Sequence, residues 1–281
     1  MKIVKVLNNN AVVIKDKGQE KIVIGSGIGF RKGKNDLVNP RKIEKLFVLK
    51  ENEKLQHLLL RIPEDHFVLS EEIIAYAEEQ LNTKLNDHIH IALTDHLTFA
   101  IEREKKGIQL KNKLLYEIKT LYKKEFDIGL WAIQHIKEKL NVNMPVDEAA
   151  FIALHIHTMK LHGGDWQETV RQTTLVRDMV HTIKDFLNIA VEEDDISYER
   201  LITHLRFSLT RTKQSKLHTM DKEMLKMIRR KYPLSYRCAA KVAKDLSSLH
   251  GINLPESELG YIALHIERLR KMRDTEEESP K

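Results

Sequence analysis

Cysteine, proline, glycine and aromatic residues are all scarce in this chain of 281 residues. The single cysteine, Cys238, cannot form an internal disulfide. No apolar run approaches the roughly 18–20 residues that span a bilayer. The first ten residues, MKIVKVLNNN, lack the long apolar stretch and the small-residue cleavage site of a signal peptide. These absences argue against disulfide-rich secreted proteins and membrane-inserted proteins, so we expect a cytoplasmic location.

Positive charge is concentrated at the N-terminus. Residues 1–50 contain twelve Lys and Arg against four Asp and Glu, a net charge of +8, whereas the whole chain carries +6. The rest of the chain is therefore slightly acidic. A small basic segment suits a polyanion, and nucleic acid is the first candidate. An ordinary solvated basic surface would show the same excess.

The apolar periodicity changes after about residue 50. Four short runs rich in Val and Ile predict strands over 2–7, 11–15, 20–24 and 45–49. From about Glu53 the spacing is helical, and Ser70 followed by two glutamates predicts the start of a helix. Further helices are predicted over 86–101, 113–122, 128–140, 147–160, 166–187, 197–211, 221–232, 236–249 and 256–273, with a linker at 162–165.

One apolar octapeptide occurs twice, as IALHIHTM at 152–159 and as IALHIERL at 262–269. An offset of 110 also aligns other residues of the helical part: Tyr122 with Tyr232, Pro145 with Pro255, and Glu148 with Glu258. This pattern indicates a tandem duplication of a helical domain of about 100 residues. We therefore expect a multidomain chain, in which a small antiparallel all-β N-terminal domain precedes two tandem all-α helical bundles.

Each helical copy contains two histidines in matching contexts. His96 and His155 belong to the first copy, and His204 and His265 belong to the second. A histidine on an apolar helix stripe is usually a satisfied core residue, but the survival of both pairs after duplication favours a function. Three chemistries fit: metal binding, acid–base or nucleophilic catalysis, and acceptance of a phosphoryl group by a neutral imidazole.

Metal binding and catalysis fit the repeat poorly. His88-Ile-His90 and His155-Ile-His157 resemble ligand pairs, but residues two apart on a helix point about 200° apart. The second copy has Glu267 in place of His157. A metal-dependent hydrolase remains the alternative reading.

A catalytic triad is also disfavoured, because Asp95 beside His96 becomes Thr203 in the second copy. A phosphoryl acceptor needs neither feature, and an added dianion would reverse the local electrostatics. Arg103 and Arg211 each lie seven residues after a repeated histidine, on the same helix face. They could serve such a charge switch or be ordinary solvated arginines.

Two polar loops follow strands in the basic segment. Asn8-Asn9-Asn10 could contact base edges or simply form a turn, since asparagine tolerates the left-handed conformation. Gly25-Ser-Gly-Ile-Gly-Phe-Arg-Lys32 could bring backbone N–H groups, an aromatic ring and cations to RNA. The second loop is neither a Walker motif nor a Rossmann fingerprint. The strand-rich start also argues against a helix-turn-helix DNA-binding activator.

The order NNNAVVIK, EKIVIGSGIGF, NDLV, KIEKLFVL, DHIHIALTDHLTFAIER, IALHIHT, YERLITHLRF and IALHIERL resembles the BglG/SacY family of bacterial transcription antiterminators over essentially the whole chain. The sucrose-responsive members look most similar. The resemblance implies a co-antiterminator RNA-binding domain over 1–55 and two phosphotransferase-system (PTS) regulation domains over 65–170 and 171–281. It implies a homodimer without enzymatic activity or cofactor.

The same resemblance implies the partners and site residues. The chain would bind a hairpin RNA of leader mRNA and prevent terminator formation. The histidine phosphocarrier protein and a sugar-specific PTS permease would phosphorylate it. The implied phosphorylation sites are His96, His155, His204 and His265. The implied RNA-binding residues are Lys5, Asn8, Asn10, Gly25, Ser26, Gly27, Phe30 and Arg31.

Overall fold

The computed structural model describes residues 1–16, 19–47, 60–160, 165–189, 196–213 and 220–277. The expected elements at 48–49 and 53–59 and the linker residues 162–164 lie outside these ranges. The chain divides into two compact units. The first comprises residues 1–112 and 124–164, and the second comprises 113–123 and 165–281.

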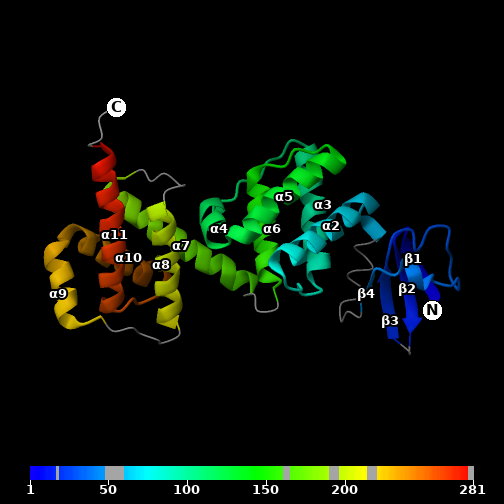
Figure 1. Ribbon diagram of the computed structural model, residues 1–281, viewed down its shortest axis with the longest axis horizontal. Helices are drawn as coiled ribbons and strands as arrows, with labels where there is room; N and C mark the ends of the chain where they lie inside the picture. The colour runs from blue at the N-terminus through cyan, green and yellow to red at the C-terminus, as the bar shows by residue number, and fades with distance from the viewer. Residues whose placement is uncertain (17–18, 48–59, 161–164, 190–195, 214–219, 278–281) are drawn as a thin grey trace. The chain divides into compact units, whose positions relative to one another are not determined.

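The N-terminal segment is a four-stranded sheet with the order β1-β2-β3-β4 (Figure 1). The strands are β1 (Lys2–Asn8), β2 (Ala11–Asp16), β3 (Gln19–Ile24) and β4 (Lys45–Phe47), and each pairs antiparallel with its neighbour. The expected antiparallel all-β domain is therefore confirmed. Its strand boundaries match the Val- and Ile-rich runs closely.

Both faces of the sheet are buried. On one face Ala11 and Val13 pack with Phe67 of helix α2 (Glu64–Leu81). On the other face Val12 and Ile14 pack with Ile28 from the β3–β4 connection. Side chains alternate between the faces along a strand, so a strand that is covered on both sides reads as a continuous apolar run. This explains the unbroken sequence AVVI in β2.

The helices of the first unit surround one apolar core. They are α2 (Glu64–Leu81), α3 (Ile89–Lys105), α5 (Lys123–Leu140) and α6 (Val146–Thr158). Gly129 of α5 lies so close to α6 that an added Cβ would be 2.2 Å from the Ala149 carbonyl oxygen. Glycine therefore permits the close approach of these two helices.

The predicted helix start at Ser70 is wrong. Helix α2 begins at Glu64, directly after Pro63, and has Glu64 and Asp65 in its first turn. Ser70 is buried within the helix, where its hydroxyl donates to the His66 carbonyl oxygen at 2.8 Å. Burial of Phe67 and Leu69 extends the apolar stripe upstream of the serine, so tertiary packing overrides the local capping signal.

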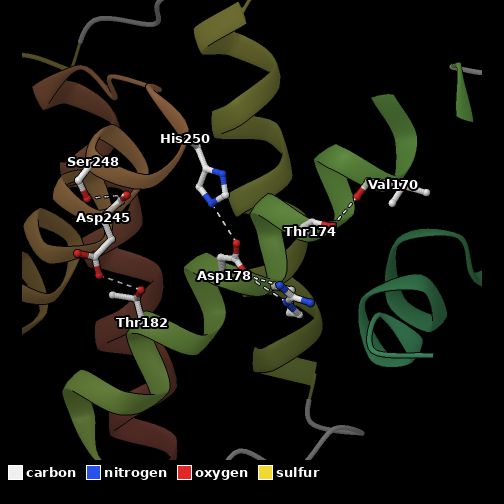
Figure 2. Close-up of polar contacts among 8 residues, drawn as sticks. Val170, Thr174, Asp178, Thr182, Asp245, Ser248 and His250 are labelled. Carbon is white, nitrogen blue, oxygen red and sulfur yellow. Dashed lines mark hydrogen bonds and ion pairs between the residues drawn. The ribbon is translucent and has the colours of Figure 1, made fainter. Parts of the chain in front are cut away.

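The second unit is entirely helical in its described residues. It contains α4 (Leu115–Leu121), α7 (Trp166–Leu187), α8 (Ile196–Lys213), α9 (Lys222–Lys231), α10 (Pro233–His250) and α11 (Glu256–Glu277). Polar contacts join α7 to α10 at one edge: His250 Nε2 lies 3.0 Å from Asp178, and Thr182 donates to Asp245 at 3.2 Å (Figure 2).

The duplication is visible in the helix boundaries. Helices α5 and α10 begin at residues 123 and 233, and α6 and α11 begin at 146 and 256. Both pairs therefore repeat with the offset of 110 that the sequence shows. Corresponding residues of the two copies consequently occupy corresponding helices.

Candidate functional site

The two polar loops of the sheet form one surface. The Gly25 N–H donates to the Asn10 carbonyl oxygen at 3.0 Å, and the Gly27 N–H donates to Asn10 Oδ1 at 2.6 Å. The Gly29 N–H donates to the Asn9 carbonyl oxygen at 2.8 Å. These bonds fix the Asn8–Asn10 turn against the glycine-rich loop.

Glycine is required at position 25 by close packing. A Cβ there would lie 1.7 Å from the Lys42 carbonyl oxygen. Gly27 has φ +60, a conformation that L side chains rarely adopt, and its backbone N–H faces Asn10. Both predicted glycines therefore shape the loop.

An exposed aromatic–cation pair lies at the end of the glycine-rich loop. Phe30 is 55% exposed, and the Arg31 guanidinium carbon lies 5.3 Å from the centre of its ring. Arg31 itself has φ 54. Ser26 and Lys5 are also exposed. An open aromatic face flanked by cations is suited to an unpaired base and its phosphate.

The side chains of Asn8, Asn9 and Asn10 all form hydrogen bonds within the protein, which the sequence did not predict. Asn8 Oδ1 accepts from the Asn10 N–H at 2.9 Å, which closes the turn. The Nδ2 groups of Asn10 and Asn9 donate to the two carboxylate oxygens of Glu64, at 2.7 and 2.9 Å. Sequence reasoning missed both Asn9 and Glu64. The tripeptide NNN marked the position of Asn9, whereas no local signal indicated Glu64, which lies more than fifty residues away.

The first histidine pair joins α3 to α6. The ring centres of His96 and His155 lie 4.8 Å apart, with 41° between the planes. Burial, with a smaller contribution from His96, lowers the pKa of His155 to about 3. His155 is therefore neutral at physiological pH. Both rings are partly exposed.

The second pair joins α8 to α11 and is tighter. The rings of His204 and His265 are stacked, with centres 3.7 Å apart and 20° between the planes. Burial, followed by repulsion from His204, Arg268 and Arg211, lowers the pKa of His265 to about 4. The pKa of His204 is also lowered, by burial and then by Arg211. Both rings are partly exposed, so neutral imidazole nitrogens lie within reach of solvent.

Each histidine pair lies near an Arg–Glu ion pair whose carboxylate is buried. Arg103 contacts Glu148, which is 1% exposed, and Glu148 also lies 3.2 Å from His96 Nε2. In the second copy Arg211 donates to both carboxylate oxygens of Glu258, at 2.8 and 2.6 Å. The two arginines are thus engaged in ion pairs, which disfavours the reading of ordinary solvated arginines.

Two other histidines of the first helical copy, His157 and His90, contact carboxylates. His157 Nδ1 lies 2.9 Å from Glu125, which also pairs with Lys160. Burial alone would raise the pKa of Glu125, but hydrogen bonds from His157 and Lys160 outweigh it and lower the pKa to about 2. His90 Nδ1 lies 2.5 Å from Glu71.

The second copy replaces the Glu125 contact with a related one. Glu267 accepts from Ser235 at 2.8 Å and from Arg270 at 3.2 Å. Positions 235, 267 and 270 correspond to 125, 157 and 160, so the acid has moved from one helix to the other. The change from His157 to Glu267 therefore exchanges the positions of the acidic residue and its polar partner in a contact that both copies keep.

The metal and triad readings gain nothing from this geometry. Within the described ranges, no group of three or more His, Cys, Asp or Glu side chains is placed to hold a metal ion. Asp95 is exposed, and the carboxylate that lies beside His96 is that of Glu148. In the same described residues, no helix is both long and apolar enough to span a bilayer.

Comparison with known protein families finds one match in the sheet region and two matches of a single family in the helical part. Residues 1–56 match the CAT RNA binding domain, and residues 71–159 and 177–269 each match the PRD domain. The crystal structure of GlcT CAT-PRDI superposes with a TM-score of 0.53 at 38% identity, covering 57% of this chain and 98% of that one. The multidomain β-then-α fold and the two helical copies expected from sequence are confirmed.

Full-length relatives give the same result. The beta-glucoside operon antiterminator of Dickeya chrysanthemi is 39% identical over 96% of this chain and 97% of its own length. Transcription antiterminator LicT of Bacillus subtilis is 39% identical over 96% of this chain and 99% of its own length. The metal-dependent hydrolase finds no support among these relatives, and the sucrose-type assignment stays a prediction. The chain belongs to the BglG family of antiterminators, with a CAT RNA binding domain followed by two PRD domains.

Proposed function

We propose that this chain is a transcription antiterminator that binds a hairpin in nascent leader mRNA and so prevents a terminator from forming. Relatives that are named antiterminators match it along nearly their whole length. In this proposal residues 1–55 bind RNA. Residues 65–170 and 171–281 are PTS regulation domains that control the binding.

RNA recognition is assigned to the joined loops of the sheet. Phe30 would stack on an unpaired base, while Arg31 and Lys5 would contact phosphates. Gly25 and Gly27 would shape the loop so that its backbone can lie close to the RNA, with Ser26 exposed between them. Asn8 and Asn10 mainly hold the loops in place, and Asn9, whose amide donates to Glu64, is exposed beside them.

Control is assigned to the four paired histidines, His96, His155, His204 and His265. All four rings are partly exposed, and a neutral imidazole is a competent acceptor of a phosphoryl group. The donors would be the histidine phosphocarrier protein and a sugar-specific PTS permease. A phosphoryl group adds a charge near −2, which would alter the packing of the helices that carry it.

The remaining expectations follow from the same assignment. The chain would act as a cytoplasmic homodimer, would be a regulator without enzymatic activity or cofactor, and would respond to sucrose or a related sugar. Two RNA-binding sheets in a dimer would present a larger surface to one folded hairpin than a single sheet does.

The observation that carries the proposal is the exposed Phe30–Arg31 pair, which lies beside loops tied together by Asn10. A gel-shift assay with the full-length chain and candidate leader hairpins tests it. Replacing Phe30 by Ala should weaken hairpin binding about fivefold or more, since one stacked base contributes about 1–3 kcal/mol. Leu37→Ala is the control, because Leu37 is also exposed but bridges to Lys2 at the other end of β1.

Adding the phosphocarrier protein, and separately the permease, tests the control. We expect phosphorylation of the wild-type chain to change hairpin affinity. Equal affinities of wild-type, Phe30→Ala and Leu37→Ala chains for every hairpin would contradict the RNA assignment.

A further inference from the structure

A buried ion pair lies beside the second histidine pair. Glu258 is fully buried (0% exposed) and accepts two hydrogen bonds from the Arg211 guanidinium. The Arg211 side chain is 26% exposed, so it connects the buried carboxylate to the surface. Buried carboxylates with a bidentate guanidinium partner are strongly held, because removal of one partner leaves an uncompensated charge.

Arg211 also faces the two histidines. His204, His265 and Arg211 line one cavity of about 240 Å³, together with Ser208 and Tyr261. A phosphoryl group on either ring would therefore enter a space that already has a guanidinium in its wall. Arginine binds phosphate through two parallel hydrogen bonds, with the same fork geometry that it uses for a carboxylate.

A phosphoryl dianion would compete with Glu258 for this guanidinium. It carries more charge than a carboxylate and offers three acceptor oxygens. Glu258 would keep one partner after losing the arginine, because Ser208 Oγ donates to its Oε2 at 2.7 Å. The exchange therefore leaves the buried carboxylate with a hydrogen bond.

We propose that Arg211 is the phosphate-binding residue of the second PRD domain, and that it leaves Glu258 for the phosphoryl group when His204 or His265 is phosphorylated. This inference rests on the proposed phosphorylation of these histidines. In the unmodified protein, Glu258 holds the Arg211 guanidinium in position beside the two histidines. Phosphorylation is thereby converted into the loss of an ion pair between α8 and α11.

The first PRD domain has the same arrangement with one difference. Arg103 and Glu148 correspond to Arg211 and Glu258, but the position of Ser208 is occupied by Ala100. Glu148 instead lies 3.2 Å from His96 Nε2. The carboxylate of Glu148 would therefore face both the loss of its arginine and a phosphoryl group nearby, so we expect a larger rearrangement in the first domain.

The test uses ³¹P NMR of the full-length chain after chemical phosphorylation with phosphoramidate. In this reaction the P–N bond of phosphoramidate breaks, an N–P bond to imidazole forms, and ammonia leaves. Resonances of the second domain are those absent from the His204→Ala/His265→Ala variant. The measured quantity is the pKa of the phosphoryl group, which a neighbouring guanidinium lowers.

Opposite effects are expected for the two partners. Arg211→Gln should raise the pKa of the phosphoryl group by about 1, the lower end of the effect of an adjacent opposite charge. Glu258→Gln should lower it below the wild-type value, because a neutral amide competes less than the carboxylate for the Arg211 guanidinium. A merely structural ion pair would leave this pKa unchanged in both variants.

Arg268→Gln is the matched control, because Arg268 is exposed and also lies near His265 but has no buried carboxylate partner among the contacts described. Its effect should be smaller than that of Arg211→Gln. If Arg211→Gln does not fold, the decrease in Glu258→Gln still decides.

Failure of this inference and failure of the proposed phosphorylation give different results. Formation of phosphohistidine with an unchanged phosphoryl pKa in both Arg211 and Glu258 variants overturns this inference alone. Absence of any phosphohistidine at His204 and His265, with phosphoramidate and with the phosphocarrier protein, overturns the proposed control as well.

Discussion

The rings of His204 and His265 are stacked with their centres 3.7 Å apart, although the two residues lie 61 positions apart in the sequence. At this distance two imidazolium ions would repel each other strongly, so the pair favours neutral rings. The corresponding rings of His96 and His155 are 4.8 Å apart and more inclined. His155, His204 and His265, whose pKa values are lowered, are thus neutral at physiological pH.

Because burial lowers the pKa of His155, the free energy of unfolding of the chain depends on pH. The pKa of His155 in the folded chain is about 3, against an ordinary value of 6.5. Between these values the unfolded chain binds a proton that the folded chain does not, so the free energy of unfolding falls as the pH is lowered below about 6.5. His155→Gln should flatten this fall by at most about 1.4 kcal/mol per pH unit.

Urea unfolding at several pH values between 7 and 4 measures the slope. His181→Gln provides the control, since the His181 side chain is 73% exposed. Identical slopes in the wild-type and His155→Gln chains would show that the ring is not held neutral by the fold.

Gly25 provides a test of the loop geometry. Gly25→Ala would place a methyl group 1.7 Å from the Lys42 carbonyl oxygen, so one backbone segment must move. We expect a loss of about 3 kcal/mol or more in the stability of the sheet, at the upper end of the usual cost of overpacking. Hydrogen exchange of the β2 and β3 amides measures this loss.

Gly33→Ala is the matched control in the same sheet domain, because the nearest atom to its Cβ would be 4.0 Å away. Its exchange rates should equal those of the wild type. Equal protection in the Gly25 and Gly33 variants would contradict the described packing.

Glu64 is expected to oppose RNA binding. Its carboxylate accepts from the amides of Asn9 and Asn10 and places a negative charge beside the proposed RNA surface. Glu64→Ala should tighten hairpin binding about fivefold, equivalent to roughly 1 kcal/mol for the released hydrogen bonds. A filter-binding assay measures the affinity. Asp65→Ala is the control: it removes a negative charge from the next residue, which is exposed, and should have a smaller effect. Weaker binding by Glu64→Ala would mean that this contact supports the RNA-binding form.

The Glu125 contact predicts a rescue between copies. Glu125→Ser should cost about 1–3 kcal/mol, because His157 and Lys160 lose their shared carboxylate. Adding His157→Glu and Lys160→Arg reproduces the Ser235–Glu267–Arg270 arrangement and should restore most of the stability. Thermal unfolding of the single and triple variants compares them, and a triple variant no better than Glu125→Ser would show that the surroundings of the two sites are not equivalent.

Local patterns predicted the elements well where the signals were redundant. The boundaries of α7, Trp166–Leu187, are those expected from periodicity, and Asp165 caps its first turn. Helix α10 begins at Pro233, three residues before the predicted start, because proline is favoured in the first turn of a helix. Ser70 misled the prediction, since the serine faces the interior of a longer helix.

The site was only partly predictable, because its contacts are long-range. Repetition alone marked His155 and His265 as candidates, and the loop that contains Phe30 and Arg31 marked those two residues as candidates. The pairing of Arg103 with Glu148 spans 45 residues, which no local pattern encodes. Glu148 did carry a signal: it is an acidic residue at the start of an apolar helix, and it recurs at the same offset as the histidines.

The exchanged acid between the two PRD domains has a consequence for folding of the tandem chain. If α5 packed against α11 by mistake, Glu125 and Glu267 would be buried together, and only Arg270 would compensate their charge. If α10 packed against α6, His157 and Lys160 would lie beside Ser235 without a carboxylate to accept their hydrogen bonds. Neighbouring domains of similar sequence are prone to such misassembly. The polar partners of each copy therefore pair correctly only within that copy. This disfavours cores that mix helices of the two domains, although both domains have the same architecture.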